Sequence, residues 1–327
     1  MKNTMRNLLL CLLLCTLLLT GCFPGTDGEN VPATVEVTYV LGNGEENITQ
    51  TVTTLFGIVK PPEPKKENYL FTGWYKDENA TLPYDMSSTL KKDITLYAGW
   101  TFDYETYINE AGKNLMPSTL KIQAYTYTSN FFGSQITSSQ AGSGVIIFED
   151  KAYYYLLTNH HVTYLTANGT KAYVVTDLYE NEYDATLLST SAEYDLSLLR
   201  IQKNAATKPL LVADLAETTP TVGALCVAVG TPGGVRNAIT FGHIIDFETV
   251  TLTDEDKKSS NVTLPVLWHT APMDHGSSGG ALFSDDGKLI GINYACSLVN
   301  DEFSRGYSIT IDDVRAFLNE TLLQDYI

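Results

Sequence analysis

The sequence predicts a mostly β protein whose main domain is a sandwich or barrel of about 200 residues. From Thr119 onward, short runs of β-branched and aromatic residues are separated by Gly, Asn and Asp, which is typical of many strands joined by turns. The last segment repeats apolar residues at helical spacing, at Val314, Phe317, Leu318 and Leu322. Thr310 and Asp313 form a capping-box pattern before it. We therefore expect a β domain that closes with one helix and follows a smaller β-rich unit.

The first 22 residues indicate export. A basic start, MKNTMR, precedes the apolar run NLLLCLLLCTLLL, which is too short to favour a membrane-spanning helix of roughly 20 residues. The next residues, LTGC, resemble the bacterial lipobox, in which the cysteine is acylated and becomes the first residue of the mature chain. We expect residues 1–21 to be a lipoprotein signal peptide and Cys22 to carry the lipid that anchors the protein to the bacterial cell membrane, outside the cytoplasm. The alternative is an ordinary signal peptide, with Cys22 incidental.

Residues 22–33 are rich in Gly, Pro and acidic residues and have no apolar period, so we expect a lipid-anchored tether. Residues 34–101 form a separate unit of β-branched and aromatic runs, with a Gly-Asn-Gly turn at 42–44. The expected strands of this unit are VEVTYV, ITQTVTTLFG, YLFTGWY and ITLYAGW. The sequence therefore predicts a small β-rich domain after the tether.

This small unit closely resembles the internalin-type B repeat of bacterial surface proteins. The resemblance covers almost all of it, including GWY at 73–75, YD at 84–85 and the closing LYAGW at 96–100. It implies a ubiquitin-like β-grasp fold and a spacer or docking role on the cell surface, with a cell-wall or surface partner. We expect the aromatic residues to form the core of this domain rather than a carbohydrate-binding platform.

Residues 102–118 are expected to be a linker or a short helix, and residues 119–327 the main β domain. The expected strands of this domain are KIQAYTYT, GSGVIIFE, AYYYLLTN, KAYVVTDL, DATLLST, DLSLLRI, ALCVAVG, ITFGHIIDFE, VLWHTA, GGALFS, KLIGINYA and GYSIT. Two cysteines, Cys226 and Cys296, lie in apolar strand contexts, where a small buried thiol is the commoner explanation and a disulfide the alternative.

Composition excludes some functions. The chain has 38 acidic and 21 basic residues and a formal net charge of -17, which argues against general nucleic-acid binding because phosphate recognition needs lysine and arginine. No HExxH sequence, cysteine-rich zinc pattern or phosphate-cradling loop is present in the sequence, so we expect neither a cofactor nor a catalytic metal.

The stretch DHGSSGGALF, residues 274–283, places two serines among glycines. A serine nucleophile needs a histidine base, an acid that orients the base, and backbone donors for the developing oxyanion. Ser278 has Gly276 two residues before it, where glycine can turn its amide into the site, whereas Ser277 has His275 there. We therefore expect Ser278 to be the nucleophile and the amides of Gly276 and Ser278 to form the oxyanion hole.

Four motifs resemble, in order and spacing, those of trypsin-like serine proteases, closest to the bacterial HtrA (Deg-type) family. They are GSGVII with YLLTNHHV, AEYDLSLLRI, VGTPGG with TFGHI, and HGSSGGALFSDDGKLIGI. The resemblance implies the chymotrypsin-like double six-stranded β-barrel fold and cleavage of peptide bonds in protein or peptide substrates. By position it implies a catalytic triad of His161, Asp195 and Ser278.

The adjacent histidines need a separate argument. Neighbours on an extended chain point to opposite sides, so His160 and His161 should not both reach one site. The resemblance favours His161, which directly precedes the valine of TNHHV, and leaves His160 as a surface or packing residue. Ser277 stands where zymogen-type trypsins have an aspartate, so activation by cleavage is not implied.

The same resemblance to trypsin-like proteases predicts the residues of the substrate pocket. Its base is Pro272, six residues before the expected nucleophile, and not an acidic residue of the kind that selects Lys or Arg. The predicted pocket wall consists of Ile292, Asn293, Tyr294, Tyr307 and Ser308. We expect a small or medium apolar residue before the scissile bond.

The sequence thus predicts a membrane-anchored extracytoplasmic serine endopeptidase that acts through a Ser-His-Asp triad and an acyl-enzyme. The alternative is a non-catalytic surface adhesion or scaffold protein in which the protease-like domain is inactive. The presence of His161, Asp195, Ser278 and Gly276 together argues against the alternative, because an idle site has no physical need of all four.

Overall fold

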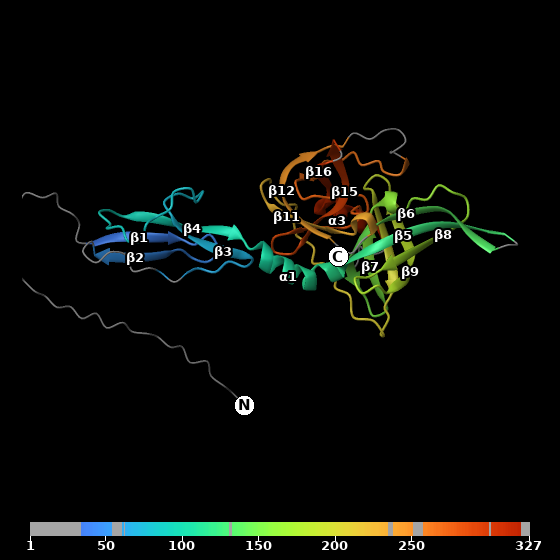
Figure 1. Ribbon diagram of the computed structural model, residues 1–327, viewed down its shortest axis with the longest axis horizontal. Coiled ribbons are helices and arrows are strands. Elements are labelled where there is room, and N and C mark those ends of the chain that lie inside the picture. Colours follow the sequence, from blue (N-terminus) through green and yellow to red (C-terminus); the bar gives the residue numbers. More distant parts are fainter. Residues whose placement is uncertain are drawn as a thin grey trace, which may run out of the picture. The chain divides into compact units, whose positions relative to one another are not determined.

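The computed structural model describes residues 34–53, 61, 63–130, 133–234, 238–250, 258–300 and 302–321 (Figure 1). The chain forms two compact units: one holds residues up to 64 and residues 73–99, and the other holds residues 65–72 and 100–327. The predicted signal peptide, Cys22, the tether and Leu322 lie outside the described residues.

A four-stranded sheet in the order β2-β1-β4-β3 belongs mainly to the smaller unit, although residues 69–72 of β3 and 100–102 of β4 are assigned to the larger unit. Its strands are β1 (Thr34–Val40), β2 (Ile48–Thr53), β3 (Tyr69–Tyr75) and β4 (Ile94–Phe102). The first strand is antiparallel to β2 and parallel to β4, which is the arrangement expected of a β-grasp sheet. Alternate residues of β1 are buried, and the rings of Tyr39 and Trp74 meet edge to face at 4.7 Å, so these aromatic side chains belong to the core.

Residues 102–118 form part of the larger unit. They contain helix α1 (Tyr104–Asn114) and the short helix η1 (Met116–Ser118). The Asp103 side chain caps α1 by accepting a hydrogen bond from the amide of Thr106 at 3.1 Å. Tyr107 and Ala111, four residues apart on one helix face, are buried, and the Tyr107 hydroxyl donates to the carbonyl of Ser284. The segment is therefore a packed helix and not a free linker.

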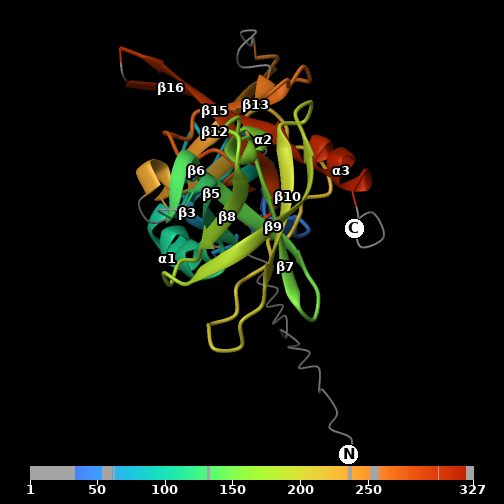
Figure 2. The same ribbon diagram turned by 90° about the vertical axis from the view of Figure 1, so that its right-hand side faces the viewer.

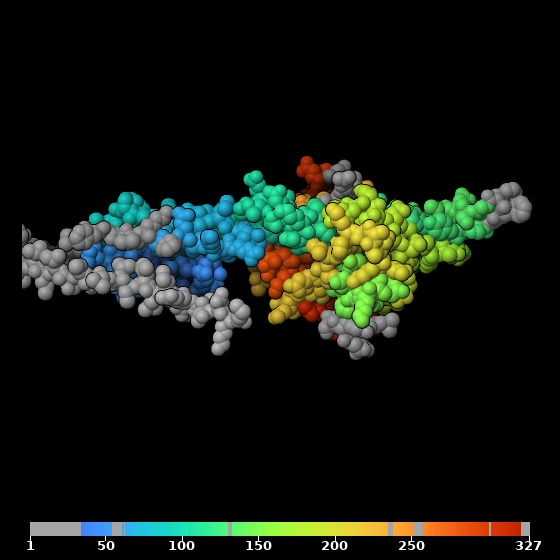
Figure 3. All heavy atoms as spheres, turned by 90° about the horizontal axis from the view of Figure 1, so that it is seen from below, coloured from blue at the N-terminus to red at the C-terminus, as the bar shows by residue number. Residues whose placement is uncertain are grey.

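The first barrel is closed, with the strand order β10-β7-β6-β5-β8-β9 (Figure 2). Its strands are β5 (Thr119–Asn130), β6 (Gly133–Glu149), β7 (Tyr153–Thr158), β8 (Thr170–Thr176), β9 (Glu182–Ser191) and β10 (Leu196–Gln202). A short helix, α2 (His160–Thr163), follows β7. The sequence pattern predicted all six strands, but it began β6 at Gly142. The nine residues before Gly142 are largely polar and pair with β5 in a hairpin whose far end stands clear of the barrel (Figure 3).

The second barrel is closed as well, with the order β11-β12-β13-β16-β15-β14. Its elements are β11 (Leu225–Gly230), η2 (Pro232–Gly234), β12 (Ala238–Glu248), β13 (Val266–His269), β14 (Ala281–Ser284), β15 (Leu289–Val299), β16 (Glu302–Thr310) and α3 (Ile311–Asn319). The amide of Asp313 donates to the Thr310 hydroxyl at 3.1 Å, so the predicted cap of the last helix is present. The prediction of two six-stranded barrels and a C-terminal helix is confirmed.

One apolar core joins the two barrels. It includes Val145 and Leu157 of the first barrel, Val227 and Phe283 of the second, and Phe317 of α3. Cys226 and Cys296 are free thiols. Within the described residues, no helix has both the length and the apolar character needed to cross a membrane.

Candidate active site

Strand pairing brings His161 and Asp195 together. β7 and β10 are antiparallel, with Thr158 opposite Ser197, so the residues after β7 lie beside those before β10. The Asp195 carboxylate accepts two hydrogen bonds from His161, one from Nδ1 at 2.6 Å and one from the backbone amide at 2.8 Å. The proton on Nδ1 is thus held by the carboxylate, which leaves Nε2 as the acceptor.

Asp195 is fixed by its own backbone as well as by His161. It is fully buried, and its carbonyl accepts hydrogen bonds from the His160 amide and from the side-chain amide of Asn159. Its φ of +48° is an uncommon conformation that aspartate tolerates better than most residues. Four hydrogen bonds from residues 159–161 therefore orient the carboxyl group, and through it the imidazole.

His160 faces away from this pair. Its Nδ1 is hydrogen-bonded to the Thr190 hydroxyl, and its ring packs near Tyr164. Burial lowers the pKa of His160, which favours its neutral form. The two neighbouring histidines thus point to different surroundings, but they do so from the start of the helix α2 and not from an extended strand, which the sequence argument wrongly assumed.

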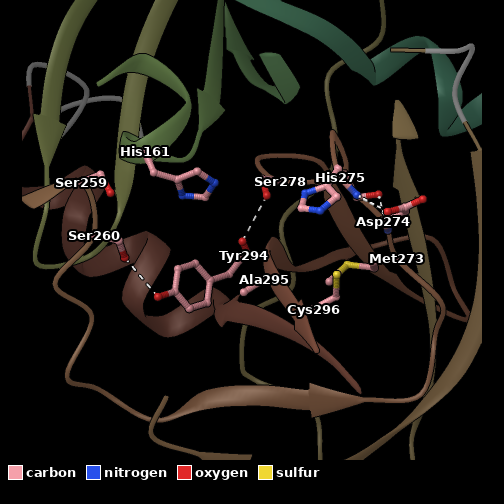
Figure 4. Close-up of a pocket in the computed structure, with 11 residues that line it drawn as sticks. His161, Ser259, Ser260, Met273, Asp274, His275, Ser278, Tyr294, Ala295 and Cys296 are labelled. Carbon is pink, nitrogen blue, oxygen red and sulfur yellow. Dashed lines mark hydrogen bonds between the residues drawn. The ribbon is translucent and has the colours of Figure 1, made fainter. Parts of the chain in front are cut away.

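Ser278 lies in the loop between β13 and β14, at the mouth of a pocket that also contains His161 (Figure 4). Its hydroxyl donates to the carbonyl of Tyr294 at 3.2 Å. Within the described part of the chain it makes no hydrogen bond to His161. A serine side chain changes direction by rotation about one bond, and catalytic hydrogen bonds in ligand-free enzymes often form only when substrate binds.

Ser277 lines the same pocket, but its hydroxyl has a partner within its own loop. It is buried beside β11, where a Cβ added at Gly230 would lie 3.0 Å from the Ser277 Cα. Its hydroxyl accepts the amide of Asp274 at 3.3 Å. Ser277 is therefore a loop-forming residue, whereas Ser278 presents its hydroxyl to the pocket.

The backbone amides of Gly276 and Ser278 are the two that could form the predicted oxyanion hole. In the residues that the structure describes, neither the Gly276 nor the Ser278 amide donates a hydrogen bond. The carbonyl of His275 accepts the amide of Gly233 at 2.7 Å, and because N–H and C=O of a trans peptide point in opposite directions, the Gly276 N–H points away from Gly233. Gly276 has a φ of +95°, which glycine adopts freely. The two amides have the character of an oxyanion hole.

The pocket beside Ser278 has a volume of about 340 Å³. Of the six residues predicted for it, only Tyr294 is in its lining. Pro272 and Asn293 line a different cavity, and Ile292 is in the core. Ser308 is buried and donates to the Asn293 side chain, and the Tyr307 hydroxyl donates to Glu248. Sequence alignment missed Met273, Ala295, Cys296, Ser259 and Ser260, which do line the pocket. Met273, Ala295 and Cys296 are each one or two residues from a predicted position, so they belong to the same segments as the predicted residues.

The remaining histidines have distinct places. His275 lines the pocket on the loop that carries Ser278, His243 is exposed on β12, and His269 is buried in the second barrel. Among the described residues, no group of three or more His, Cys, Asp or Glu side chains is arranged to hold a metal ion.

Comparison with known proteins agrees with this geometry. Residues 142–292 match the trypsin-like peptidase domain, and residues 36–99 match the Listeria-Bacteroides repeat domain. The chain is 27% identical over 224 residues to serine protease HTR4 of Bos taurus, covering 68% of this chain and 43% of the relative. It is 28% identical over 231 residues to the serine protease Do-like HtrA of Bacillus subtilis, covering 67% of this chain and 49% of the relative. The chain therefore spans about half or less of the length of these relatives.

The fold has a solved counterpart. The crystal structure of the active form of the Rv3671c protease from M. tuberculosis superimposes with a TM-score of 0.53 at 22% sequence identity, over 67% of this chain and 87% of that one. The chain thus carries a trypsin-like peptidase domain with HtrA- and Deg-type homologues, preceded by a Listeria-Bacteroides repeat domain.

Proposed function

We propose that the protein is a serine endopeptidase in which Ser278 is the nucleophile, His161 the base and Asp195 the residue that orients the base. The observation that carries this proposal is the buried Asp195 carboxylate on Nδ1 of His161, whose imidazole lines the same pocket as Ser278. Among the described residues, the amides of Ser278 and Gly276 have no acceptor. The homologues named serine proteases support the same reaction class.

In the proposed reaction, Ser278 Oγ leaves the Tyr294 carbonyl and attacks the carbonyl carbon of the scissile bond while its proton moves to Nε2 of His161. The amides of Gly276 and Ser278 donate to the negative oxygen that forms. Collapse of this intermediate breaks the C–N bond, and the leaving nitrogen takes the proton from His161. A water molecule, deprotonated by His161, then hydrolyses the ester on Ser278 and restores the serine.

We also propose that the protein works outside the cytoplasm, held to the bacterial membrane by lipid on Cys22. The support for this is the basic and apolar N-terminal segment that ends in LTGC. The repeat domain would then act as a spacer or bind a cell-wall or surface partner. Protein or peptide substrates are proposed, with a small or medium apolar residue before the scissile bond.

Labelling with a fluorophosphonate probe tests the catalytic proposal. We expect the folded protein to be labelled and Ser278→Ala to lose labelling, because the probe bonds to an activated serine oxygen. The matched control is Ser277→Ala, which removes the neighbouring hydroxyl and should keep labelling.

The base is tested in the same way. His161→Ala should reduce the labelling rate by several orders of magnitude, while His160→Ala should keep most of it. The proposal is wrong if the folded wild-type protein is not labelled, or if Ser278→Ala is labelled as fast as the wild type. Loss of activity in His160→Ala alone would reassign the base.

A further inference from the structure

Ser143 is a fully buried serine on β6 of the first barrel, yet its side chain reaches across to two segments of the second barrel. Its hydroxyl donates to the carbonyl of Gly276 at 2.7 Å and accepts the backbone amide of Thr231 at 2.8 Å. Thr231 directly follows β11, and Gly276 belongs to the nucleophile loop. One hydroxyl thus connects β6, the end of β11 and the loop that carries Ser278.

The hydrogen and both lone pairs of the Ser143 hydroxyl have hydrogen-bonding partners. A serine hydroxyl has one hydrogen to donate and two lone pairs to accept. Since its hydrogen goes to the Gly276 carbonyl, Ser143 can only accept from the Thr231 hydroxyl, whose single hydrogen is shared between Ser143 Oγ at 3.0 Å and the Gly142 carbonyl at 3.3 Å. Together with the Thr231 amide, this fills both lone pairs. Loss of the Ser143 hydroxyl would leave the Gly276 carbonyl and the Thr231 amide without that partner.

This set of Ser143 hydrogen bonds, the Ser143 bridge, fixes Gly276, the residue whose amide would face the developing oxyanion. Gly276 has no side chain and a φ of +95°, so by itself it can rotate the peptides on either side of it. The peptide before it is held by the Gly233 amide on the His275 carbonyl, and the peptide after it by the Ser143 hydroxyl on its own carbonyl. In addition, the Ser143 amide donates to the carbonyl of Ser278 at 2.8 Å. Both ends of the Gly276–Ser278 segment are therefore held by Ser143.

We propose that Ser143 is a positioning residue that holds the Gly276 amide in the orientation needed to stabilise the oxyanion. This inference rests on the proposed serine-protease function and adds a residue that touches neither the substrate nor the nucleophile's oxygen. It also makes the oxyanion hole of the second barrel dependent on correct docking of the first. Preorganised donors contribute to catalysis because they need no reorientation during the reaction.

The test measures the kinetics of fluorophosphonate labelling, since the phosphoryl oxygen of the probe occupies the oxyanion position. Ser143→Ala should lower the maximal labelling rate constant by roughly 10- to 100-fold, less than the full loss of an oxyanion donor. The concentration for half-maximal rate should change by less than about threefold, because ground-state contacts remain. The midpoint of the pH–rate profile should stay unchanged, since the His161–Asp195 pair is untouched.

Two controls separate positioning from stability. Ser118→Ala removes another buried hydroxyl, one that donates to the Leu115 carbonyl away from the pocket, and should keep the wild-type labelling rate. Thr231→Val removes a hydroxyl that supports Ser143 and should lower the rate, while Thr231→Ser keeps that hydroxyl and should restore it. If Ser143→Ala does not fold, the Thr231 pair still decides the question.

The outcomes are distinguishable from those of the proposed function. If the wild type is labelled through Ser278 but Ser143→Ala reacts as fast as Ser118→Ala, the role of Ser143 is disproved and the protease assignment stands. Equal rates for Thr231→Val and Thr231→Ser would count against the bridge as well. If wild-type protein is not labelled at all, the failure lies with the proposed function.

Discussion

At the scale of single residues, His269 is a neutral histidine enclosed in the second barrel. Its side chain is fully buried, and Nε2 donates to the Ser308 hydroxyl, because that hydroxyl in turn donates to the side-chain oxygen of Asn293. Burial lowers its pKa from 6.5 to about 4. Between pH 6.5 and about pH 4, this histidine binds a proton in the unfolded chain but not in the folded protein. The free energy of unfolding is therefore highest above pH 6.5 and decreases as the pH falls from 6.5 toward 4.

This predicts an acid sensitivity that depends on His269. When the pH falls from 7.5 to 5, the wild-type protein should lose about 2 kcal/mol more unfolding free energy than His269→Gln. Urea denaturation at both pH values measures this difference. His243→Gln removes an exposed histidine of the same barrel and should behave as the wild type. An equal pH dependence in His269→Gln and the wild type would contradict the prediction.

The sequence distinguishes the two serines and the two histidines by features that are local to each pair. Ser278 has a glycine two residues before it, and that glycine adopts a positive φ. Adjacent residues of the chain also diverge, which separates His160 from His161. The direction of the Ser278 hydroxyl was not predictable, since it depends on Tyr294, sixteen residues away on another strand.

At the scale of secondary-structure elements, a bulge in β15 explains why the predicted pocket differs from the observed one. The pairing of β15 with β16 shifts register between Asn293 and Ala295. A bulge places an extra residue in one strand and redirects the side chains that follow. As a result Tyr294, Ala295 and Cys296 all line the pocket, where strict alternation would have placed Ile292 and Tyr294 on one face.

The pocket lining leads to a specificity prediction. Met273 and Cys296 lie on one side of the pocket (Figure 4), and their soft apolar side chains favour a small or medium apolar residue before the scissile bond. A peptide-library cleavage profile should show this preference. Cys296→Leu should shift it toward smaller residues because the added volume fills the pocket, whereas Cys226→Ala, outside the pocket lining, should leave it unchanged.

Asp274 is an acidic residue in the lining of a pocket that we expect to prefer an apolar residue. Its carboxylate, however, accepts the amide of His275 at 2.6 Å and is thereby directed toward its own loop. A profile dominated by Arg or Lys would disprove the apolar preference and identify Asp274 as the counter-charge.

At the scale of the whole molecule, the candidate site exists only where the two barrels meet. His161 and Asp195 come from the first barrel, and Ser278 and Gly276 from a loop of the second. The contacts that hold them together are long-range hydrogen bonds, such as the Ser143 amide to the Ser278 carbonyl. Gly279 allows this approach, since a Cβ there would lie 2.2 Å from the Ser143 carbonyl oxygen.

Membrane attachment through lipid on Cys22 is our proposal for the full-length chain. Two acyl signals hold a protein firmly on a bilayer, each buried methylene adding roughly 0.8 kcal/mol. When the full-length gene is expressed in a lipoprotein-processing bacterium, the wild-type protein should fractionate with membranes and incorporate labelled palmitate. Cys22→Ala should lose both properties, and the control Cys15→Ala, within the apolar run of the predicted signal, should keep them. Membrane attachment and palmitate incorporation that persist in Cys22→Ala would refute the anchor.

The sequence by itself determined the β-rich unit, the strands of both barrels, the capped final helix and the identity of the candidate triad. The strands and the helix follow from residue periodicity and local capping patterns, whereas the candidate triad follows from motifs that resemble those of trypsin-like serine proteases. Tertiary structure alone decided the packing of α1, the shifted pocket wall and the link from Ser143 to Gly276. Each of these depends on which side chains meet after two barrels close and dock, and residues 133 positions apart in the chain leave no local pattern that reports such a contact.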